Sequence, residues 1–548
     1  MESRPLVVQS DRTMLMDVHD PASSQCRDTI VPFSELVKSP EHLHTYQITR
    51  ISLWNACSAG LGEDDVMSAL SRFSRYEIPE TVEYFIRDTC RRYGVVRFTP
   101  LDDRFFLLEC TSELYRRQVL SIPAVRDIII DDGDIRVPMN RRGDMKVILI
   151  DHDFPVQDLI PLKKGRPLEI ALREVCASGA PFLVRNYQRE AFDALWAGGA
   201  PGAGYGTVVL PCGSGKTIVG LVAMARLKTS TLILAPNVAS VHQWRREILD
   251  KTTLEQDDVG EFTSERRDIR PVTIATYSML IWRSSTDEEF HNFDTISAHE
   301  WGFVIYDEVH MLPAPVFKLS SSLQAVYRLG LTATLVREDG REKDVFSLVG
   351  PKRYDVPWSQ LEKRGFIARA YCHELRIAMS EEDELAYAMA PLQTKIAIAA
   401  KNGRKLDVVA RLLERHEGEQ ILIIGQYIDQ LRRIAGHFNL PLITGSMPNA
   451  TRDRLYQDFR DGRISILVVS KVANFAIDLP DASVAIQVSG TFGSRQEEAQ
   501  RLGRILRPKM RDSNFYTLVT RHSREEDFSL NRQKFLIEQG YAYSVEDV

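Results

Sequence analysis

The chain has 548 residues, too many for a single hydrophobic core, so about two to four domains are expected. Hydrophobic residues make up 44% and charged residues 26%, which is ordinary for a globular protein, and no apolar run reaches bilayer-spanning length. The formal net charge of −6 gives no support for nucleic-acid binding by the surface as a whole, although it permits a local basic channel. The N-terminus lacks a secretory signal pattern, so a cytoplasmic protein without membrane association is expected.

The seven cysteines are scattered along the chain and form no Cys-x-x-Cys pair. This dispersal argues against a structural zinc ion or an iron–sulfur cluster, and it suits reduced thiols in a cytosol. We therefore expect no structural metal.

Residues 1–170 predict a small α+β region. Short alternating runs begin it, and an apolar helical patch is predicted around residues 33–37. Helix-length segments with apolar residues at helical spacing and two strand-like runs follow, at residues 49–60, 63–76, 79–94, 95–98 and 104–110. Three helices before a hairpin suggest a winged-helix-like module, and a generic α+β scaffold is an equal alternative.

From Phe182 onward, strand-like and helix-like segments alternate, which predicts parallel sheets covered by helices on both faces. Two sets of five strands are expected, at residues 207–210, 231–235, 272–276, 303–307 and 325–334, and at residues 421–425, 440–445, 464–470, 482–489 and 514–520. The alternation pauses between the two sets. We therefore expect two similar doubly wound α/β domains, at residues 171–365 and 366–548.

The stretch from Thr207 to Leu227 combines a buried strand, a glycine-rich turn and a helix, which is typical of a phosphate-binding loop. The strict pattern has a glycine where this chain has Leu210, so an ordinary helix entry is the alternative reading of this stretch alone. The glycines let backbone N–H groups surround an anion, the lysine reaches the β- and γ-phosphates, and the threonine ligates Mg²⁺. The residues expected to bind ATP here are Pro211, Cys212, Gly213, Ser214, Gly215, Lys216 and Thr217.

A second motif, Asp307-Glu308-Val309-His310, ends a predicted strand. A carboxylate at this place in a nucleotide hydrolase holds Mg²⁺, so Asp307 is the expected magnesium ligand and Glu308 the residue that orients and deprotonates the attacking water. His310 is expected to sense the γ-phosphate or to connect it to the neighbouring domain. Thr332 and Thr334 end the next strand, where their hydroxyls can bond this motif and transmit the nucleotide state.

Two further groups complete the expected ATP site. Arg185 and Gln188 precede the first strand, where the glutamine can read adenine through its amide group; the start of an ordinary amphipathic helix is the alternative. In the second half of the chain, Gln500, Arg504 and Arg507 form the pattern Gln-x-x-Gly-Arg-x-x-Arg, which brings arginine fingers to the γ-phosphate; a solvated basic face is the alternative. One phosphate loop for two sheets is typical of motors that bind one ATP between two RecA-like domains.

At this point the motifs GSGKT, DEVH, TAT and QRLGRILR together resemble those of superfamily 2 helicases. Arg337, Glu338 and Asp339 look like the RED motif of XPB-type helicases, and the segments PCGSGKT, SKVANFAIDLP and GSRQEEAQRLGRILRPK are similar to that family. The resemblance covers residues 182–548, and the N-terminal region resembles the front end of prokaryotic members.

The resemblance implies a DNA-dependent ATPase and 3′→5′ DNA helicase that serves DNA repair of the nucleotide-excision type. It implies contacts mainly to the DNA backbone, with Thr276, Thr444 and Ser470 at motif positions for DNA, and a role of the RED motif in duplex opening. A damage-recognition part is expected within residues 60–150 and a short thumb-like insertion at about 380–402. A nuclease is a candidate partner, and a prokaryotic cytosol is the favoured location.

Two other functions fit the same motifs. A double-strand DNA translocase would remodel bound complexes without separating strands. An ATP-gated scaffold would recruit a nuclease without acting as a motor, although the presence of Lys216, Glu308, Arg504 and Arg507 together speaks against it.

Overall fold

The computed structural model describes residues 4–38, 42–58, 60–102, 104–130, 133–199, 203–211, 213–283, 290–312, 323, 325–333, 349–356, 358–366, 369–470, 482–489, 512–538 and 542–548. The chain divides into two compact units. The first comprises Met1–Val209 and Lys216–Asp355, and the second Leu210–Gly215 and Val356–Val548. Within the described part of the chain, no helix has both the length and the apolar character that crossing a membrane requires.

The N-terminal part of the first unit begins with a four-stranded antiparallel sheet in the order β1-β2-β4-β3. Its elements are β1 (Leu6–Val8), β2 (Thr13–Asp17), α1 (Ser23–Ile30), β3 (Glu35–Lys38), β4 (Leu43–Gln47), α2 (Arg50–Ser58), α3 (Glu63–Phe73) and α4 (Glu80–Arg92). The three expected helices are thus confirmed. The helical patch expected around residues 33–37 is wrong, because a single 3-10 turn at Val31–Phe33 leads directly into β3, whose pairing with β4 takes up its backbone.

A second small sheet follows, in the order β7-β6-β5-β8. Its elements are β5 (Val96–Pro100), β6 (Phe105–Cys110), α5 (Glu113–Ser121), α6 (Pro123–Arg126), β7 (Arg136–Pro138), α7 (Arg142–Asp151) and β8 (Val156–Asp158). The predicted hairpin is present as β5 and β6. The winged-helix interpretation is wrong, because α2, α3 and α4 pack into one core with β1–β4, whereas the hairpin packs into a separate core with α5–α7.

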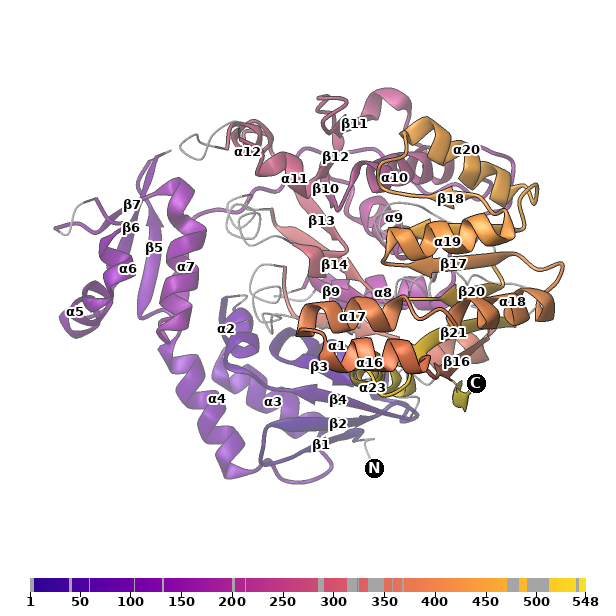
Figure 1. The fold of residues 1–548 in the computed structure, drawn as a ribbon. Coiled ribbons are helices and arrows are strands. Elements are labelled where there is room, and N and C mark those ends of the chain that lie inside the picture. Colours follow the sequence, from indigo (N-terminus) through magenta and orange to yellow (C-terminus); the bar gives the residue numbers. More distant parts are fainter. Residues whose placement is uncertain are drawn as a thin grey trace. The chain divides into compact units, whose positions relative to one another are not determined.

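The rest of the first unit is built on a seven-stranded parallel sheet in the order β11-β12-β10-β13-β14-β9-β15 (Figure 1). Its strands are β9 (Tyr205–Val209), β10 (Thr231–Ala235), β11 (Val259–Phe262), β12 (Val272–Thr276), β13 (Phe303–Asp307), β14 (Tyr327–Thr332) and β15 (Lys352–Asp355). The helices are α8 (Asn186–Trp196), α9 (Lys216–Leu227), α10 (Val238–Lys251), α11 (Tyr277–Leu280) and α12 (His291–Ser297). Apolar runs such as TLILA in β10 form the central strands because both faces of the sheet are covered.

The register of this sheet gathers its strand ends at one edge. Ala235 pairs with Thr276, Asp307 with Leu331, and Thr332 with Val209. The carboxyl ends of β9, β10, β12, β13 and β14 therefore lie together, which is the edge where open parallel sheets carry their binding sites.

The second unit contains another seven-stranded parallel sheet, in the order β18-β19-β17-β20-β21-β16-β22. Its strands are β16 (Ala370–Ile377), β17 (Ile421–Gly425), β18 (Leu442–Ile443), β19 (Ile466–Ser470), β20 (Val484–Gln487), β21 (Ser513–Thr520) and β22 (Ala542–Asp547). The helices are α15 (Trp358–Lys363), α16 (Glu381–Met389), α17 (Leu392–Ala400), α18 (Lys405–Arg415), α19 (Ile428–Phe438), α20 (Asn449–Arg460) and α23 (Arg524–Glu538). The helices α16 and α17 occupy the segment expected to form a thumb-like insertion.

The two doubly wound domains and all ten predicted strands are confirmed, but the expected number of strands per sheet is wrong. Each sheet has seven strands, because β11, β15, β16 and β22 were not predicted. Their sequences, VGEF, KRYD, AYCHELRI and AYSVED, mix charged with apolar residues. Three of them lie at sheet edges, where strands tolerate polar side chains, and β16 lies beside the edge strand β22.

Candidate active site

The glycine-rich loop joins the end of β9 to the start of α9. Gly213 and Gly215 have φ angles of 77° and 83°, a left-handed conformation that costs glycine little. Between them, Ser214 donates its hydroxyl to the carbonyl of Pro211 at 2.6 Å, which closes the turn. The loop thus has the backbone curl that anion-binding loops require, directly before the N-terminus of a twelve-residue helix.

The strand β13 ends in the two acidic residues of the site. Lys216 Nζ, in the first turn of α9, lies 3.2 Å from Glu308 Oε1. Glu308 itself has φ 46° and ψ 54°, the left-handed conformation that side chains other than glycine rarely adopt. Such strain costs about 1–2 kcal/mol and persists where the surrounding structure imposes it, most often at functional sites.

The charges in this cluster separate the two carboxylates. Burial and the neighbouring Glu308 raise the pKa of Asp307 to about 6. Burial alone would raise the pKa of Glu308 as well, but electrostatic interactions, chiefly with the positive charge of Lys216 and secondarily with His310, outweigh burial and hold that pKa below its usual value. Glu308 is therefore ionised at neutral pH and can accept a proton or a hydrogen bond from water.

One oxygen of Glu308 is held and the other is available. Lys216 lies beside Oε1, whereas Oε2 is buried, accepts no hydrogen bond from the described residues, and has His310 Nδ1 at 3.4 Å. A buried carboxylate oxygen without a hydrogen bond calls for a water molecule or another donor. This arrangement fits a base that positions an attacking water.

Asp307 and Thr217, the residues expected to hold Mg²⁺, both carry oxygen donors. Mg²⁺ prefers hard oxygen ligands and binds proteins through one or two side chains plus substrate phosphates. Asp307 supplies a carboxylate. Burial disfavours the ionised form of this carboxylate, and a bound cation would favour it. Thr217 supplies a hydroxyl at the start of α9. The residues present fit a nucleotide-bound magnesium ion.

His310 connects the acidic motif to the neighbouring strand. His310 Nδ1 and Thr332 Oγ1 share a hydrogen bond of 2.7 Å, and both side chains are buried. The strand pairing of β13 with β14 brings these two positions together. The structure therefore joins the DEVH motif to the first threonine of the TAT motif, as their placement at adjacent strand ends suggested.

Two residues that the sequence did not indicate hold Asp307. Trp244, from α10, donates its indole N–H to Asp307 Oδ2 at 2.9 Å. Tyr277, at the start of α11, donates its hydroxyl to the Asp307 carbonyl at 2.8 Å. The available signal was an aromatic residue in the segment that follows β10 and in the one that follows β12, but aromatic residues more often fill a core.

Upstream of the loop, Arg185 and Gln188 form the cap of α8. Gln188 Oε1 accepts a hydrogen bond from the backbone N–H of Arg185 at 2.9 Å, and Arg185 Nη1 donates to Tyr187 Oη at 3.2 Å. Gln188 is 4% exposed. In this structure the glutamine thus fixes the start of the helix, and its expected role toward adenine stays a prediction.

The residues expected to contact DNA end strands in both units. Thr276 ends β12 and shares a 3.2 Å contact between its hydroxyl and that of Ser278. In the second unit, Thr444 follows β18 and its hydroxyl lies 3.1 Å from that of Ser446. Ser470 ends β19, and its buried hydroxyl makes no hydrogen bond within the described part of the chain.

Several residues named from the sequence lie outside the described residues, so the structure does not place them. They are Cys212, Thr334, Arg337, Glu338, Asp339, Gln500, Arg504 and Arg507. The structure does, however, describe β20 and β21, the strands that precede and follow the segment with Arg504 and Arg507.

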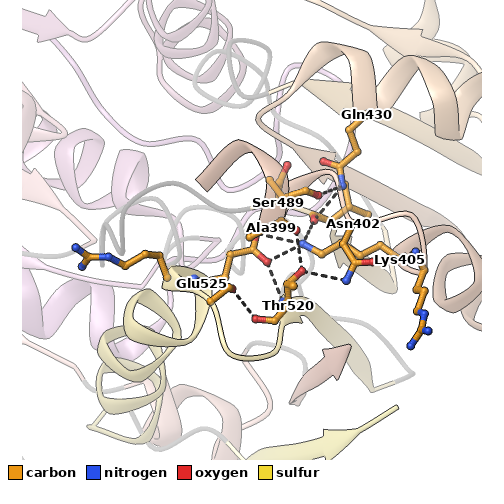
Figure 2. A network of polar contacts seen from close by, with 12 residues as sticks. Ala399, Asn402, Lys405, Gln430, Ser489, Thr520 and Glu525 are labelled. Atoms are coloured by element: carbon orange, nitrogen blue, oxygen red, sulfur yellow. Dashed lines mark hydrogen bonds and ion pairs between the residues drawn. The ribbon is translucent and has the colours of Figure 1, made fainter. Parts of the chain in front are cut away.

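A buried polar network ties together elements of the second unit (Figure 2). Lys405 Nζ, at the start of α18, donates to Glu525 Oε1 and Oε2 at 3.1 and 2.8 Å and to the Val488 carbonyl at 3.0 Å. Glu525 Oε2 also accepts the backbone N–H of Thr520 at 2.9 Å. The network fixes the residue that follows β20 against the end of β21.

A glycine loop, an acidic strand end and two parallel sheets wound with helices define a nucleotide hydrolase of the RecA-like helicase class. Residues 361–547 match the model for the ERCC3/RAD25/XPB C-terminal helicase. Residues 182–337 match the model for the type III restriction enzyme, res subunit, and residues 6–132 match that for a helicase conserved C-terminal domain.

Relatives similar to the whole chain include two bacterial proteins with the same name. The chain is 45% identical to "DNA 3'-5' helicase XPB" of Kineococcus radiotolerans, over 100% of this chain and 97% of the relative, and equally identical to that of Mycobacterium tuberculosis, of which it covers 98%. The chain therefore belongs to the XPB family of DNA 3′–5′ helicases. Among solved structures, a DNA-bound restriction-modification enzyme, LlaBIII, shares the fold at a TM-score of 0.50 and 15% identity, over 67% of this chain and 32% of that one.

Proposed function

We propose that this chain is an ATP-driven 3′→5′ DNA helicase that acts in DNA repair of the nucleotide-excision type. The observation that carries the proposal is an ion pair. Its lysine, Lys216, comes directly after a phosphate-binding loop, and its glutamate, Glu308, has a strained backbone and follows the last residue of β13. The full-length similarity to relatives named DNA 3'-5' helicase XPB supports DNA as the substrate and 3′→5′ as the polarity.

The chemistry follows from the charges at the site. The loop N–H groups and Lys216 bind the β- and γ-phosphates, and Glu308 holds the attacking water with its available Oε2 and accepts the water's proton. Thr217 and Asp307 would hold Mg²⁺, which supplies positive charge against the phosphates when it is bound. Arg504 and Arg507 would stabilise the charge that develops on the γ-phosphoryl group.

Movement on DNA requires the two doubly wound domains to alternate their grip. Thr276, Thr444 and Ser470, at strand ends, are proposed contacts to the DNA backbone, and Arg337, Glu338 and Asp339 are proposed to act in opening the duplex. Because such contacts go to phosphates, binding is expected to be strongly salt-dependent and weakly sequence-specific. We further propose a nuclease partner and, from the similarity to bacterial relatives, a prokaryotic cytosol as the location.

The test measures ATP turnover with and without DNA, and then strand displacement on duplexes with a 3′ tail, a 5′ tail or blunt ends. DNA-stimulated turnover with displacement on the 3′-tailed duplex alone is the expected result. Stimulation by blunt duplex without displacement would replace the helicase by a double-strand DNA translocase. The ATP-gated scaffold would be the better interpretation if DNA did not stimulate turnover and the Lys216→Ala variant still recruited a nuclease.

A further inference from the structure

Asp307 is held at two points by residues from two neighbouring segments. Its side-chain Oδ2 accepts the indole N–H of Trp244 at 2.9 Å, and its backbone carbonyl accepts the hydroxyl of Tyr277 at 2.8 Å. Its other side-chain oxygen, Oδ1, accepts the backbone N–H of Glu308 at 3.1 Å. Each carboxylate oxygen thus has a protein donor, which fixes the rotation of the carboxylate and leaves remaining lone pairs for a cation.

The indole reaches Asp307 because the phosphate-loop helix makes room for it. Trp244 is 1% exposed. A Cβ atom on Gly220, in the middle of α9, would lie 2.6 Å from Trp244 Cη2 and 3.1 Å from Cζ3. Glycine weakens a helix relative to alanine, so its presence at this buried position is explained by the packing of the indole ring. The loop helix, α10 and β13 therefore meet at a single side chain.

The tyrosine is placed by the adjacent strand. Tyr277 follows Thr276, the last residue of β12, and the residue is 3% exposed. Since β10 lies between β12 and β13 in the sheet, the hydroxyl reaches across one strand to the end of β13. The first unit thus uses the segments after β10 and β12 to fix the residue that ends β13.

We propose that Trp244 and Tyr277 are positioning residues that hold Asp307 in the orientation needed to ligate the magnesium ion of bound ATP. Neither residue touches the nucleotide in this role. The proposal rests on the proposed function, because it takes Asp307 as a magnesium ligand. Residues that orient a metal ligand by hydrogen bonding typically contribute 10- to about 100-fold to metal affinity.

The experiment uses the full-length chain and the variants Trp244→Phe and Tyr277→Phe, each of which removes a hydrogen-bond donor and keeps an aromatic ring. Trp301→Phe is the matched control, since Trp301 is 2% exposed in the same unit and donates its indole N–H to the Ile296 carbonyl at 2.8 Å, away from Asp307. Binding of a fluorescent, non-hydrolysable ATP analogue is titrated with MgCl₂, and ATP turnover is measured over the same range.

For Trp244→Phe we expect the Mg²⁺ concentration at half-maximal analogue binding to rise about tenfold. Turnover is expected to recover to within a few-fold of wild type at saturating Mg²⁺, which a general loss of structure would not allow. Tyr277→Phe is expected to shift the Mg²⁺ requirement in the same direction by a smaller factor, because its hydroxyl bonds the backbone and not the carboxylate. Trp301→Phe is expected to leave the requirement unchanged.

A spectroscopic readout tests the contact directly. Adding Mg²⁺ and the analogue to the wild type is expected to change tryptophan emission, and Trp244→Phe is expected to lose most of that change. An unchanged Mg²⁺ requirement in both variants, or an equal shift in Trp301→Phe, would overturn the proposal. The proposed function fails separately, if DNA does not stimulate turnover of the wild type while Mg²⁺-dependent binding of the analogue persists. If Trp244→Phe does not fold, Tyr277→Phe decides the matter alone.

Discussion

Each unit of this chain contains a lysine–glutamate pair at the start of a helix, and the two pairs are built differently. Lys405 is 1% exposed and donates to both oxygens of Glu525 and to a backbone carbonyl. Lys216 and Glu308 have side chains that are 11% and 18% exposed, and their nitrogen and Oε1 lie 3.2 Å apart. Glu308 also has a strained backbone and an oxygen that accepts no hydrogen bond from any residue the structure describes.

We call Lys405–Glu525 the structural pair, because it stabilises the fold, and Lys216–Glu308 the chemical pair, because it is suited to take part in a reaction. In the second unit, both oxygens of the buried Glu525 carboxylate accept hydrogen bonds, so the pair holds α18, α23 and the end of β21 together. In the first unit, one carboxylate oxygen stays available although it is buried, which costs stability unless a ligand or water completes it. An incompletely satisfied charge pair beside a phosphate-binding loop is therefore the better indication of a reacting site.

The largest effect is expected at the chemical pair. Glu308→Gln removes the base but retains its shape, so ATP turnover should fall by about 100-fold or more while the affinity for nucleotide stays close to wild type. Steady-state turnover and analogue binding measure the two quantities. The matched control is Glu525→Gln, which should leave the turnover of the folded protein within a few-fold of wild type. Equal losses of turnover in the two variants would contradict the proposal that only the Lys216–Glu308 pair takes part in the reaction.

Breaking the structural pair, Lys405–Glu525, should lower the free energy of unfolding more than breaking Lys216–Glu308. Lys405→Met leaves Glu525 buried without its cation, and such a loss destabilises a protein by about 3–5 kcal/mol. Urea unfolding followed by circular dichroism measures the change. The double variant Lys405→Met, Glu525→Leu should recover a large part of the loss, because neither charge is then buried. No recovery in the double variant would mean that packing, and not charge, accounts for the effect.

The helix glycines of the two units offer a second contrast. Gly220→Ala forces the new methyl group against Trp244, so we expect a destabilisation of about 1–3 kcal/mol in spite of the gain in helix propensity. At Gly436, in α19, apart from its chain neighbours and the backbone of its own helix turn, no atom of the described residues lies within 4 Å of the place a methyl group would take. Gly436→Ala should therefore stabilise the second unit by about 0.5–1 kcal/mol. Thermal unfolding of the two variants should therefore move in opposite directions.

Of the two lysine substitutions, the one at Lys216 is expected to have the smaller effect on stability. Lys216→Met should change the free energy of unfolding by about 1 kcal/mol, because Glu308 is partly accessible and can take up a proton when its cation is removed. Nucleotide binding should nevertheless be lost. A destabilisation as large as that of Lys405→Met would show that the pair in the first unit also serves to hold the fold.

Much of the fold followed from local patterns. The apolar runs of β10, β13 and β17 predicted buried strands, and the alternation with helices predicted two parallel sheets, because each of these signals lies within a few neighbouring residues. The sequence did not predict β11, β15, β16 and β22. Charged residues interrupt the apolar pattern of these segments, and they become strands only by pairing with strands that are distant in the sequence. The winged-helix interpretation failed for a related reason. Consecutive helices and a hairpin need not share a core, and here they do not.

The active site divides in the same way. The sequence by itself determined the glycines, Lys216, Asp307 and Glu308, because a phosphate loop and an acidic strand end are short contiguous motifs whose chemistry depends on residue type and local backbone. Only the tertiary structure decided that Lys216 meets Glu308, that Trp244 and Tyr277 hold Asp307, and that Gly220 makes room for an indole. These contacts join residues from separate strands and helices, and the packing of the sheet sets their geometry.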